Sequence, residues 1–261
     1  MKKPVALITG ASAGIGTSFA RRLADRGHDL VIVARRKDRL DDLAQEITKS
    51  SNREVEVLVA DLESAKGARV VEDRVVDADR PVDLLVNNAG FGTSGRFDQL
   101  PIEAEEAEIN LNVIALVRLT HAALGAMVER GHGGVINVSS VGAYQPTPHS
   151  ATYAATKAFV SSFTNAIHEE LRGTGVKAMV LAPGFTHTEF HLRAGIDDQG
   201  QVPEFLWQSA DEVVAAALRD YDRGKAVCIP GPINTAAAAF SGSLPAGITR
   251  RIAAMVTKRT Y

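Results

Sequence analysis

The sequence contains a single cysteine, Cys228, among 261 residues. Because it has no second cysteine to pair with, an internal disulfide and a cysteine-based metal cluster are both excluded, which fits a reducing compartment. An excess of charge is also missing, since 29 basic residues stand against 31 acidic ones, and no run of Lys and Arg is interleaved with aromatic residues. The composition therefore gives no general reason to bind nucleic acid.

Long hydrophobic runs are absent too. The apolar run Val5–Ile8 is too short for a signal sequence, and no stretch of about 18 apolar residues follows it. We therefore expect a cytoplasmic protein with no transmembrane segment. The length and the ordinary apolar content favour one domain that covers residues 1–261.

Short runs rich in valine and isoleucine alternate with longer helix-like segments. Apolar runs of this kind suit strands covered on both faces, and strands that alternate with helices are typical of a parallel sheet. The sequence predicts seven strands, at Val5–Thr9, Leu30–Ala34, Val55–Ala60, Leu84–Asn87, Val135–Ser139, Lys177–Leu181 and Ala226–Ile229. It predicts helices that begin near Gly14, Lys37, Ser64, Ile102, Ala151 and Ala210.

A glycine-rich segment follows the first predicted strand and opens the first helix. Its glycines allow a tight turn, a close approach of a pyrophosphate and close packing of the helix. The amino end of the helix adds amide donors and the positive end of a dipole. The residues predicted to bind the phosphates of a dinucleotide are Gly10, Ser12, Gly14, Ile15 and Gly16.

Two arginines, Arg35 and Arg36, stand at the end of the second predicted strand, where a dinucleotide fold meets the adenosine ribose. An acidic residue there suits the 2′-hydroxyl of NAD(H), whereas guanidinium groups suit the 2′-phosphate of NADP(H). Since the first acidic residue is Asp38, we predict NADP(H) as the cofactor, with NAD(H) as the less favoured choice. The alternative is that both arginines only form a solvated start of a helix.

Tyr153 and Lys157 are one helical turn apart, so they share a helix face and the ammonium group can lie near the phenol. A nearby cation lowers the pKa of tyrosine from its ordinary value of about 10 and makes it useful for proton transfer. A Tyr-x-x-x-Lys pair is common on helix surfaces, so its weight comes from the glycine-rich segment and from the Ser139-Ser140 pair after the fifth predicted strand.

Together these motifs resemble the short-chain dehydrogenase/reductase family. The catalytic serine of the family precedes the tyrosine by thirteen positions, which selects Ser140 over Ser139 (153 − 140 = 13). The resemblance implies that Tyr153 is the general acid in carbonyl reduction and the general base in alcohol oxidation, that Ser140 binds the substrate oxygen, and that Lys157 binds the nicotinamide ribose and lowers the tyrosine pKa. Thr156 stands where the family more often has serine. We expect an α/β, single-domain, doubly wound Rossmann fold, a seven-stranded parallel sheet in the order 3-2-1-4-5-6-7 with helices on both faces.

Further residues are assigned by the same resemblance. It implies that the adenine is contacted by Asp61 and Leu62, and that the ribose is contacted by Asn88, Ala89 and Gly90. It also implies that the nicotinamide amide is contacted by Pro183, Gly184, Thr186 and Thr188. Asp61 is also compatible with a helix cap, and Asn88 with Gly90 is compatible with a simple turn. A fourth catalytic member, an asparagine that anchors a water, has two candidates, of which the following Arg118-Leu119-Thr120 favours Asn112 over Asn110. Either is also compatible with a mid-helix polar residue.

Segment 187–210 is predicted to be a substrate lid, because its apolar residues are set among glycine and aspartate. They are Phe190, Leu192, Ile196, Phe205, Leu206 and Trp207. An apolar lid favours a hydrophobic carbonyl or alcohol, although these residues are also compatible with ordinary core. His187, Glu189 and His191 lack the spacing of a zincin, so we expect no metal site.

The tail, about 233–261, is predicted to be helical and basic, because six basic residues and no acidic ones occur from Arg223 to Tyr261. It suits a subunit contact or a patch for an anionic carrier such as an acyl-CoA, or for an anionic membrane. We predict an NADPH-dependent carbonyl reductase, or the reverse alcohol dehydrogenase, that forms a homodimer or homotetramer through helices near 102–130 and 151–172. The alternatives are a 3-oxoacyl thioester reductase, an NAD-linked alcohol dehydrogenase and an NADP(H)-binding redox sensor.

Overall fold

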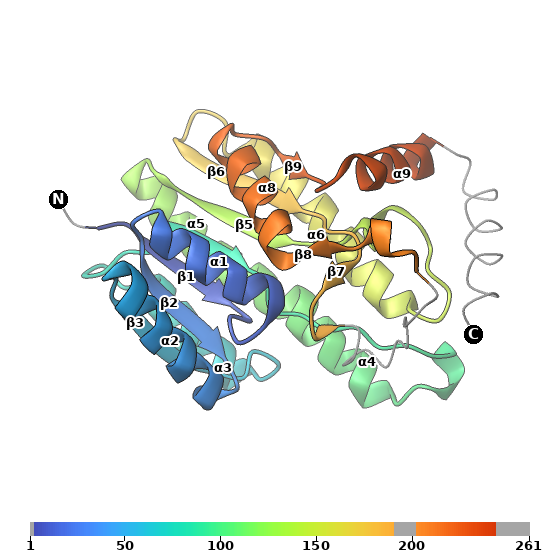
Figure 1. Ribbon diagram of the computed structural model, residues 1–261, viewed down its shortest axis with the longest axis horizontal. Coiled ribbons are helices and arrows are strands. Elements are labelled where there is room, and N and C mark those ends of the chain that lie inside the picture. Colours follow the sequence, from blue (N-terminus) through green and yellow to red (C-terminus); the bar gives the residue numbers. More distant parts are fainter. Residues whose placement is uncertain (1–2, 191–201, 244–261) are drawn as a thin grey trace.

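The computed structural model describes residues 3–190 and 202–243. Its centre is a parallel sheet of seven strands in the order β3-β2-β1-β4-β5-β6-β9, which confirms the predicted topology (Figure 1). The strands are β1 (Val5–Thr9), β2 (Asp29–Ala34), β3 (Val55–Val59), β4 (Leu84–Asn87), β5 (Gly133–Val138), β6 (Val176–Leu181) and β9 (Val227–Cys228). The strands β1, β4, β5 and β6 are almost wholly buried, as their unbroken apolar runs require.

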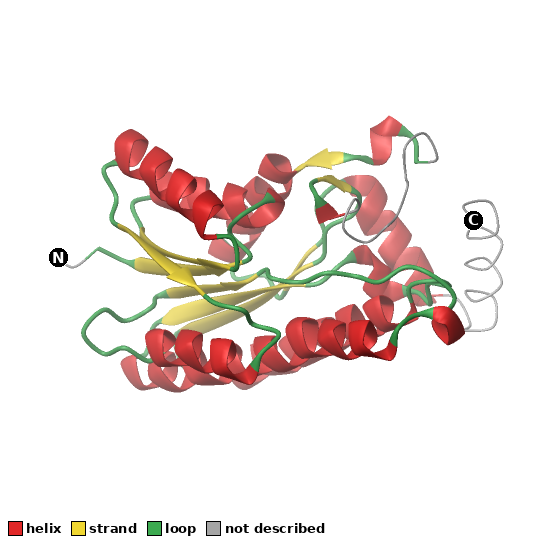
Figure 2. Cartoon of the chain, turned by 90° about the horizontal axis from the view of Figure 1, so that it is seen from below, coloured by secondary structure: helices red, strands yellow, loops and turns green. Residues whose placement is uncertain are grey.

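Helices cover both faces of this sheet (Figure 2). On one face, α1 (Gly14–Asp25), α2 (Lys37–Ser51) and α8 (Ala210–Asp222) contribute buried side chains such as Phe19, Leu40 and Val213 to one apolar cluster. On the other face, α3 (Ala65–Val75), α5 (Leu116–Arg130) and α6 (Ala151–Glu170) contribute Val71, Leu119 and Ile167 to a second cluster. The two clusters fix the carboxyl ends of the strands at one edge, where open α/β folds place their ligands.

The helices α4 (Ile102–Ile109) and α5 are continuous, because a π-helical turn, Asn110–Ala115, joins them. The whole of Ile102–Arg130 is long and apolar enough to cross a membrane, a property that core helices of water-soluble proteins share. Leu119, Ala123 and Met127 of this helix are buried against the sheet. The prediction that the chain has no transmembrane segment stays a prediction, supported by this packing.

The region after β6 is the least regular. A second, small sheet pairs β7 (Thr186–His187) with β8 (Gln208–Ser209) in parallel. The helix α9 (Pro232–Ser243) begins the predicted helical tail, whereas the rest of the tail and the lid residues Leu192 and Ile196 lie outside the described residues.

Candidate active site

The glycine-rich loop between β1 and α1 has the backbone shape that the sequence predicts. Gly10 and Gly14 have φ values of +67° and +55°, in the left-handed region that favours glycine. A Cβ atom at Gly16 would lie 2.3 Å from the carbonyl oxygen of Gly10, so a larger residue has no room there. The amino end of α1 is thus exposed to a cavity of about 810 Å³, as a pyrophosphate site requires.

Asn88, which directly follows the neighbouring strand β4, fixes the position of this loop. Its side-chain amide donates to the carbonyl oxygens of Thr9 and Gly10, at 2.9 and 3.3 Å. The Thr9 hydroxyl in turn accepts from the backbone N–H groups of Asn88 and Ala89, both at 3.0 Å. The predicted ribose-side segment, with Gly90, therefore lines the same cavity as the glycine loop and also braces it.

The two serines after β5 point in different directions. Ser139 is buried, and its hydroxyl donates to the carbonyl of Lys157 at 2.8 Å and contacts the Ser161 hydroxyl at 2.8 Å. Ser140 accepts from the N–H of Gly142 at 3.1 Å and hydrogen-bonds with the side chain of Tyr153. The structure therefore places the Ser140 side chain, and not that of Ser139, beside the tyrosine.

Tyr153 and Lys157 lie on the inner face of α6, as their spacing predicts. The Lys157 ammonium is 5.7 Å from the centroid of the tyrosine ring and donates to the Val138 carbonyl at 2.9 Å. Burial lowers the pKa of Lys157 to about 8, against the attraction of the Glu108 carboxylate. Burial also raises the pKa of Tyr153 to about 12, and the hydrogen bond with Ser140 only partly offsets this.

The predicted lowering of the Tyr153 pKa is therefore wrong for this structure. The protein around the phenol disfavours its anion, the Glu108 carboxylate adds to this effect, and the hydrogen bond with Ser140 is too weak to reverse it. In consequence Tyr153 holds its proton at neutral pH, which is the state that a general acid needs.

Asn112 lies in the π-helical turn and is buried, whereas Asn110 is exposed. The Asn112 amide donates to the Phe91 carbonyl at 2.8 Å and to the Thr156 hydroxyl at 3.2 Å, and its oxygen accepts from the Phe91 N–H at 3.2 Å. Thr156 stands where the family more often has serine, and its hydroxyl accepts this hydrogen bond from Asn112. The structure thus brings Asn112 to the site and leaves Asn110 on the surface.

Two buried carboxylates of α4, Glu105 and Glu108, escape the sequence analysis. Glu108 accepts from the N–H and the hydroxyl of Thr93, both at 2.8 Å, and Glu105 accepts from the Thr152 hydroxyl. In each, the Oε1 atom has no hydrogen-bond partner within the residues that the structure covers. Burial raises the pKa of Glu108, and its charge acts on both Tyr153 and Lys157.

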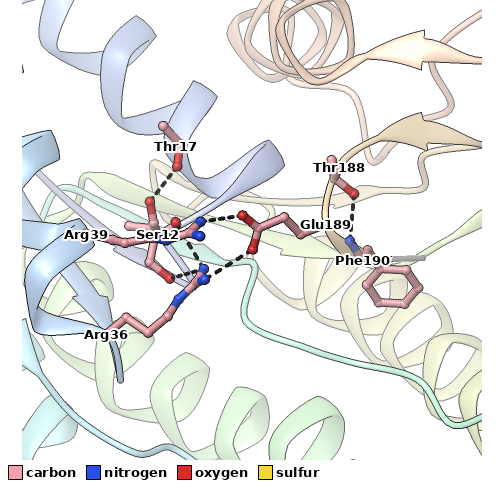
Figure 3. Close-up of polar contacts among 8 residues, drawn as sticks. Ser12, Thr17, Arg36, Arg39, Thr188, Glu189 and Phe190 are labelled. Atoms are coloured by element: carbon pink, nitrogen blue, oxygen red, sulfur yellow. Dashed lines mark hydrogen bonds and ion pairs between the residues drawn. The ribbon is translucent and has the colours of Figure 1, made fainter. Parts of the chain in front are cut away.

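The arginines after β2 both line the cavity and both face carboxylates. Arg35 pairs with Glu63 at 2.7 Å. Arg36 donates to the carbonyl and the hydroxyl of Ser12, both at 3.2 Å, and pairs with Glu189, which also pairs with Arg39 (Figure 3). The hydrogen bonds from Arg39 and Arg36 lower the pKa of Glu189 to about 2. Arg39, like Glu105 and Glu108, is a residue that the sequence analysis missed.

The remaining predicted cofactor residues line the same cavity, which confirms that they are neighbours and leaves their roles as predictions. They are Ile15, Asp61, Leu62, Pro183, Gly184, Thr186 and Thr188. Asp61 does not cap α3, because Ser64 does so by accepting from the Gly67 N–H at 3.0 Å. Thr188 packs against the glycine loop, since a Cβ at Gly14 would lie 2.7 Å from its methyl carbon.

The described part of the predicted lid contributes aromatic contacts. The ring of Phe190 packs on that of Tyr153, while Trp207 stacks on His187 with centroids 4.8 Å apart. His187 also contacts Glu204, and His191 lies outside the described residues. Within residues 3–190 and 202–243, no group of three His, Cys, Asp or Glu side chains is placed to hold a metal ion.

The family of this chain follows from its sequence as a whole. The pattern described as short chain dehydrogenase matches residues 4–198. This chain belongs to the short-chain dehydrogenase family. It is therefore an oxidoreductase that uses NAD(P)(H) and acts on small carbonyl or alcohol molecules.

Three proteins are similar to this short-chain dehydrogenase in sequence or in structure. Sulfoacetaldehyde reductase 2 from Chromohalobacter salexigens is 40% identical over 196 residues, which are 74% of this chain and 77% of that protein. A short-chain dehydrogenase from Sphingobium yanoikuyae, solved in complex with NADPH, is 39% identical with a TM-score of 0.83, over 93% of this chain and 96% of that one. A bulky-bulky ketone specific alcohol dehydrogenase from Comamonas testosteroni is 33% identical with a TM-score of 0.78, over 93% and 95%.

Proposed function

We propose that the chain is an NADPH-dependent reductase of carbonyl compounds with apolar substituents, able to oxidise the matching secondary alcohols. One observation carries the proposal. A single cavity joins the arginines Arg35 and Arg36 at one end to Ser140, Tyr153 and Lys157 at the other. The similar dehydrogenase from Sphingobium yanoikuyae, solved with NADPH, supports the choice of cofactor.

The residues of the cavity suit a dinucleotide phosphate. The glycine loop needs its glycines, because a Cβ at Gly10, Gly14 or Gly16 would lie less than 3.0 Å from other atoms of the protein. Arg36 is oriented by Ser12, and its planar guanidinium has the geometry that suits a phosphate. When bound, the cofactor supplies the hydride that reduces the carbonyl carbon.

The side chains of this chain handle the proton and the charge. Tyr153, protonated at neutral pH, gives its proton to the substrate oxygen, and Ser140 donates a hydrogen bond to that oxygen as negative charge grows on it. Lys157 binds the nicotinamide ribose, and its ammonium group is oriented by the hydrogen bond that it donates to the Val138 carbonyl. Asn112 fixes Phe91 and Thr156 on either side of this group. These roles agree with those that the family resemblance implies.

The catalytic end of the cavity favours an apolar substrate. Its lining is mainly apolar and includes Phe91, Val141, Pro148, Phe185 and Phe190. Among the described residues, Lys157 is the only basic side chain of the lining at this end. The apolar lining agrees with the resemblance to a dehydrogenase of bulky ketones. A 3-oxoacyl thioester stays a second candidate, supported by the similarity to very-long-chain 3-oxoacyl-CoA reductases and by the basic tail, whose basic residues from Arg250 on lie outside the described residues.

The remaining predictions concern the whole protein. We propose a homo-oligomer assembled through the exposed apolar residues Ile109, Ile114 and Val128 of the α4–α5 helix and Phe159 of α6. We also keep the single-domain organisation of residues 1–261 and the cytoplasmic location as predictions. Sedimentation of the purified protein tests the proposed homo-oligomer.

The decisive experiment measures the oxidation of NADPH and of NADH with a panel of bulky ketones, aldehydes, sulfoacetaldehyde and 3-oxoacyl thioesters. We expect turnover of ketones with NADPH. The variant Tyr153→Phe removes the proton donor, so turnover falls by roughly 1000-fold or more while NADPH still binds. Tyr144→Phe, a tyrosine outside the cavity lining, is the matched control and keeps its activity. Binding of NADPH without turnover of any substrate would instead support a redox sensor.

A further inference from the structure

Three charged side chains from two distant parts of the chain meet at the adenosine end of the cavity (Figure 3). Arg36 precedes α2 and Arg39 lies in its first turn, whereas Glu189 follows β7, 150 positions after Arg39. Arg36 Nη1 donates to Glu189 Oε2 at 3.2 Å, and Arg39 Nη1 donates to Glu189 Oε1. A carboxylate of the chain therefore lies between two guanidinium groups at the edge of the site.

These guanidinium groups are the donors that a 2′-phosphate needs. The position follows β2, where a dinucleotide fold holds the adenosine ribose. Arg36 and Glu189 both line the cavity, and the second Nη of Arg36 is fixed on Ser12 in the glycine-rich loop. Carboxylate and phosphate oxygens accept from the same N–H fork of arginine, so they compete for it.

We propose that Glu189 sets the cofactor specificity of this enzyme, because its carboxylate competes with the 2′-phosphate of NADP(H) for Arg36 and Arg39. Glu189 thereby weakens the binding of the phosphorylated cofactor and leaves the binding of NAD(H) nearly unchanged. Arg39 is assigned as a phosphate ligand beside Arg36. The inference rests on the proposed preference for NADP(H) and adds an internal competitor to it.

The charge balance supports competition over a purely structural contact. The trio carries two positive charges and one negative, whereas without the carboxylate the same arginines present two positive charges to a phosphate. The Glu189, Arg36 and Arg39 side chains are 36%, 30% and 45% exposed, so solvent screens the charges of the trio and limits what each pair adds to stability. Thr188, which precedes Glu189, packs on Gly14 and so keeps the backbone of residue 189 close to the arginines.

The test is Glu189→Gln, which keeps the shape of the side chain and removes its charge. Dissociation constants are measured by fluorescence titration for NADPH and NADH, and for the probes 2′,5′-ADP and 5′-AMP. We expect NADPH and 2′,5′-ADP to bind roughly three- to tenfold more tightly to the variant, while NADH and 5′-AMP change less than about twofold. Glu204→Gln is the matched control, because within residues 3–190 and 202–243 Glu204 pairs with His187 and with no arginine, and it leaves all four constants unchanged.

Two further variants separate the outcomes. Arg39→Gln weakens NADPH and spares NADH if Arg39 binds the phosphate, and Arg36→Gln does the same. If Glu189→Gln leaves the NADPH to NADH ratio unchanged, or lowers NADPH affinity as Arg39→Gln does, Glu189 orients the arginines and the competition is refuted, while the proposed cofactor stands. If the wild type binds NADH more tightly and Arg36→Gln does not alter the ratio, both the proposed cofactor and this inference fail.

Discussion

The hydroxyl of Ser139 donates a 2.8 Å hydrogen bond to the backbone carbonyl of Lys157. This bond ties the end of β5 to the helix that carries the lysine, and it turns Ser139 away from the cavity. Its neighbour Ser140 faces Tyr153 instead. Two adjacent serines thus have separate tasks, one in packing α6 on the sheet and the other in the proposed chemistry.

The serine pair gives the first prediction. Ser140→Ala removes a donor to the developing oxyanion, and we expect kcat to fall by roughly 100-fold with little change in stability. Ser139→Ala deletes a buried hydrogen bond, and we expect it to lower the free energy of unfolding by about 1 kcal/mol with a smaller effect on kcat. Steady-state kinetics and urea unfolding of both variants check the contrast, and equal losses of kcat would contradict it.

The asparagine pair gives a second prediction. Asn112→Ala leaves the N–H and the carbonyl of Phe91 without their partner, so we expect a loss of about 1–3 kcal/mol in the free energy of unfolding and a fall in kcat. Asn110→Ala, two positions away and exposed, changes neither quantity. Thermal unfolding and turnover of the two variants decide between the candidates, and a reversed result would assign the role to Asn110.

The glycine loop gives a third. A methyl group at Gly16 would lie 2.3 Å from the carbonyl oxygen of Gly10 and 2.7 Å from the amide of Asn88, and both groups are held by hydrogen bonds. Gly16→Ala therefore abolishes dinucleotide binding, as titration with NADPH will show. Gly125→Ala in α5 meets no atom within 4 Å and raises the free energy of unfolding by about 1 kcal/mol. If Gly16→Ala bound NADPH as tightly as the wild type, the loop would be able to move and accommodate the methyl group, and the prediction would be wrong.

The pH dependence of stability gives a fourth. The pKa of Lys157 is about 8 in the folded protein, below its ordinary value of 10.5, because burial disfavours the ammonium group. Between these values the unfolded chain holds a proton that the folded chain has lost, so this group makes the free energy of unfolding rise with pH across the window. Lys157→Met removes the effect. Urea unfolding of both proteins at a series of pH values should show the wild type gaining relative to the variant, and parallel curves would contradict the burial argument.

The sequence predicts those parts of the site that local signals determine. The turn at Gly10, Gly14 and Gly16 needs glycine for reasons of backbone shape, and the positions of the buried strands in the sequence follow from their apolar runs, whereas their order in the sheet was expected from the family resemblance. The spacing of Tyr153 and Lys157 is a property of any helix. Such features depend on residues that are near each other in the chain, which is why they can be found without a structure.

Other parts of the site depend on contacts between distant residues. Glu189 finds its arginines some 150 positions away, and nothing in its own segment indicates this. Glu105 and Glu108 stand in an acidic stretch that is typical of solvated helix surface, yet both are buried. The direction of the Tyr153 pKa shift was predicted wrongly for the same reason, since its burial depends on packing and not on the lysine one turn away.

The π-helical turn at Asn110–Ala115 makes this stretch sensitive to chain length. Each residue of an α-helix advances the winding by about 100°, and a π-helical turn accommodates one residue more than an α-helical turn does. Loss of a single residue here would restore regular winding and rotate the whole of α4, with Asn112, relative to α5. Gain or loss of one residue in this turn is thus expected to destroy the site, whereas substitution of the exposed Ile114 is tolerated within one subunit.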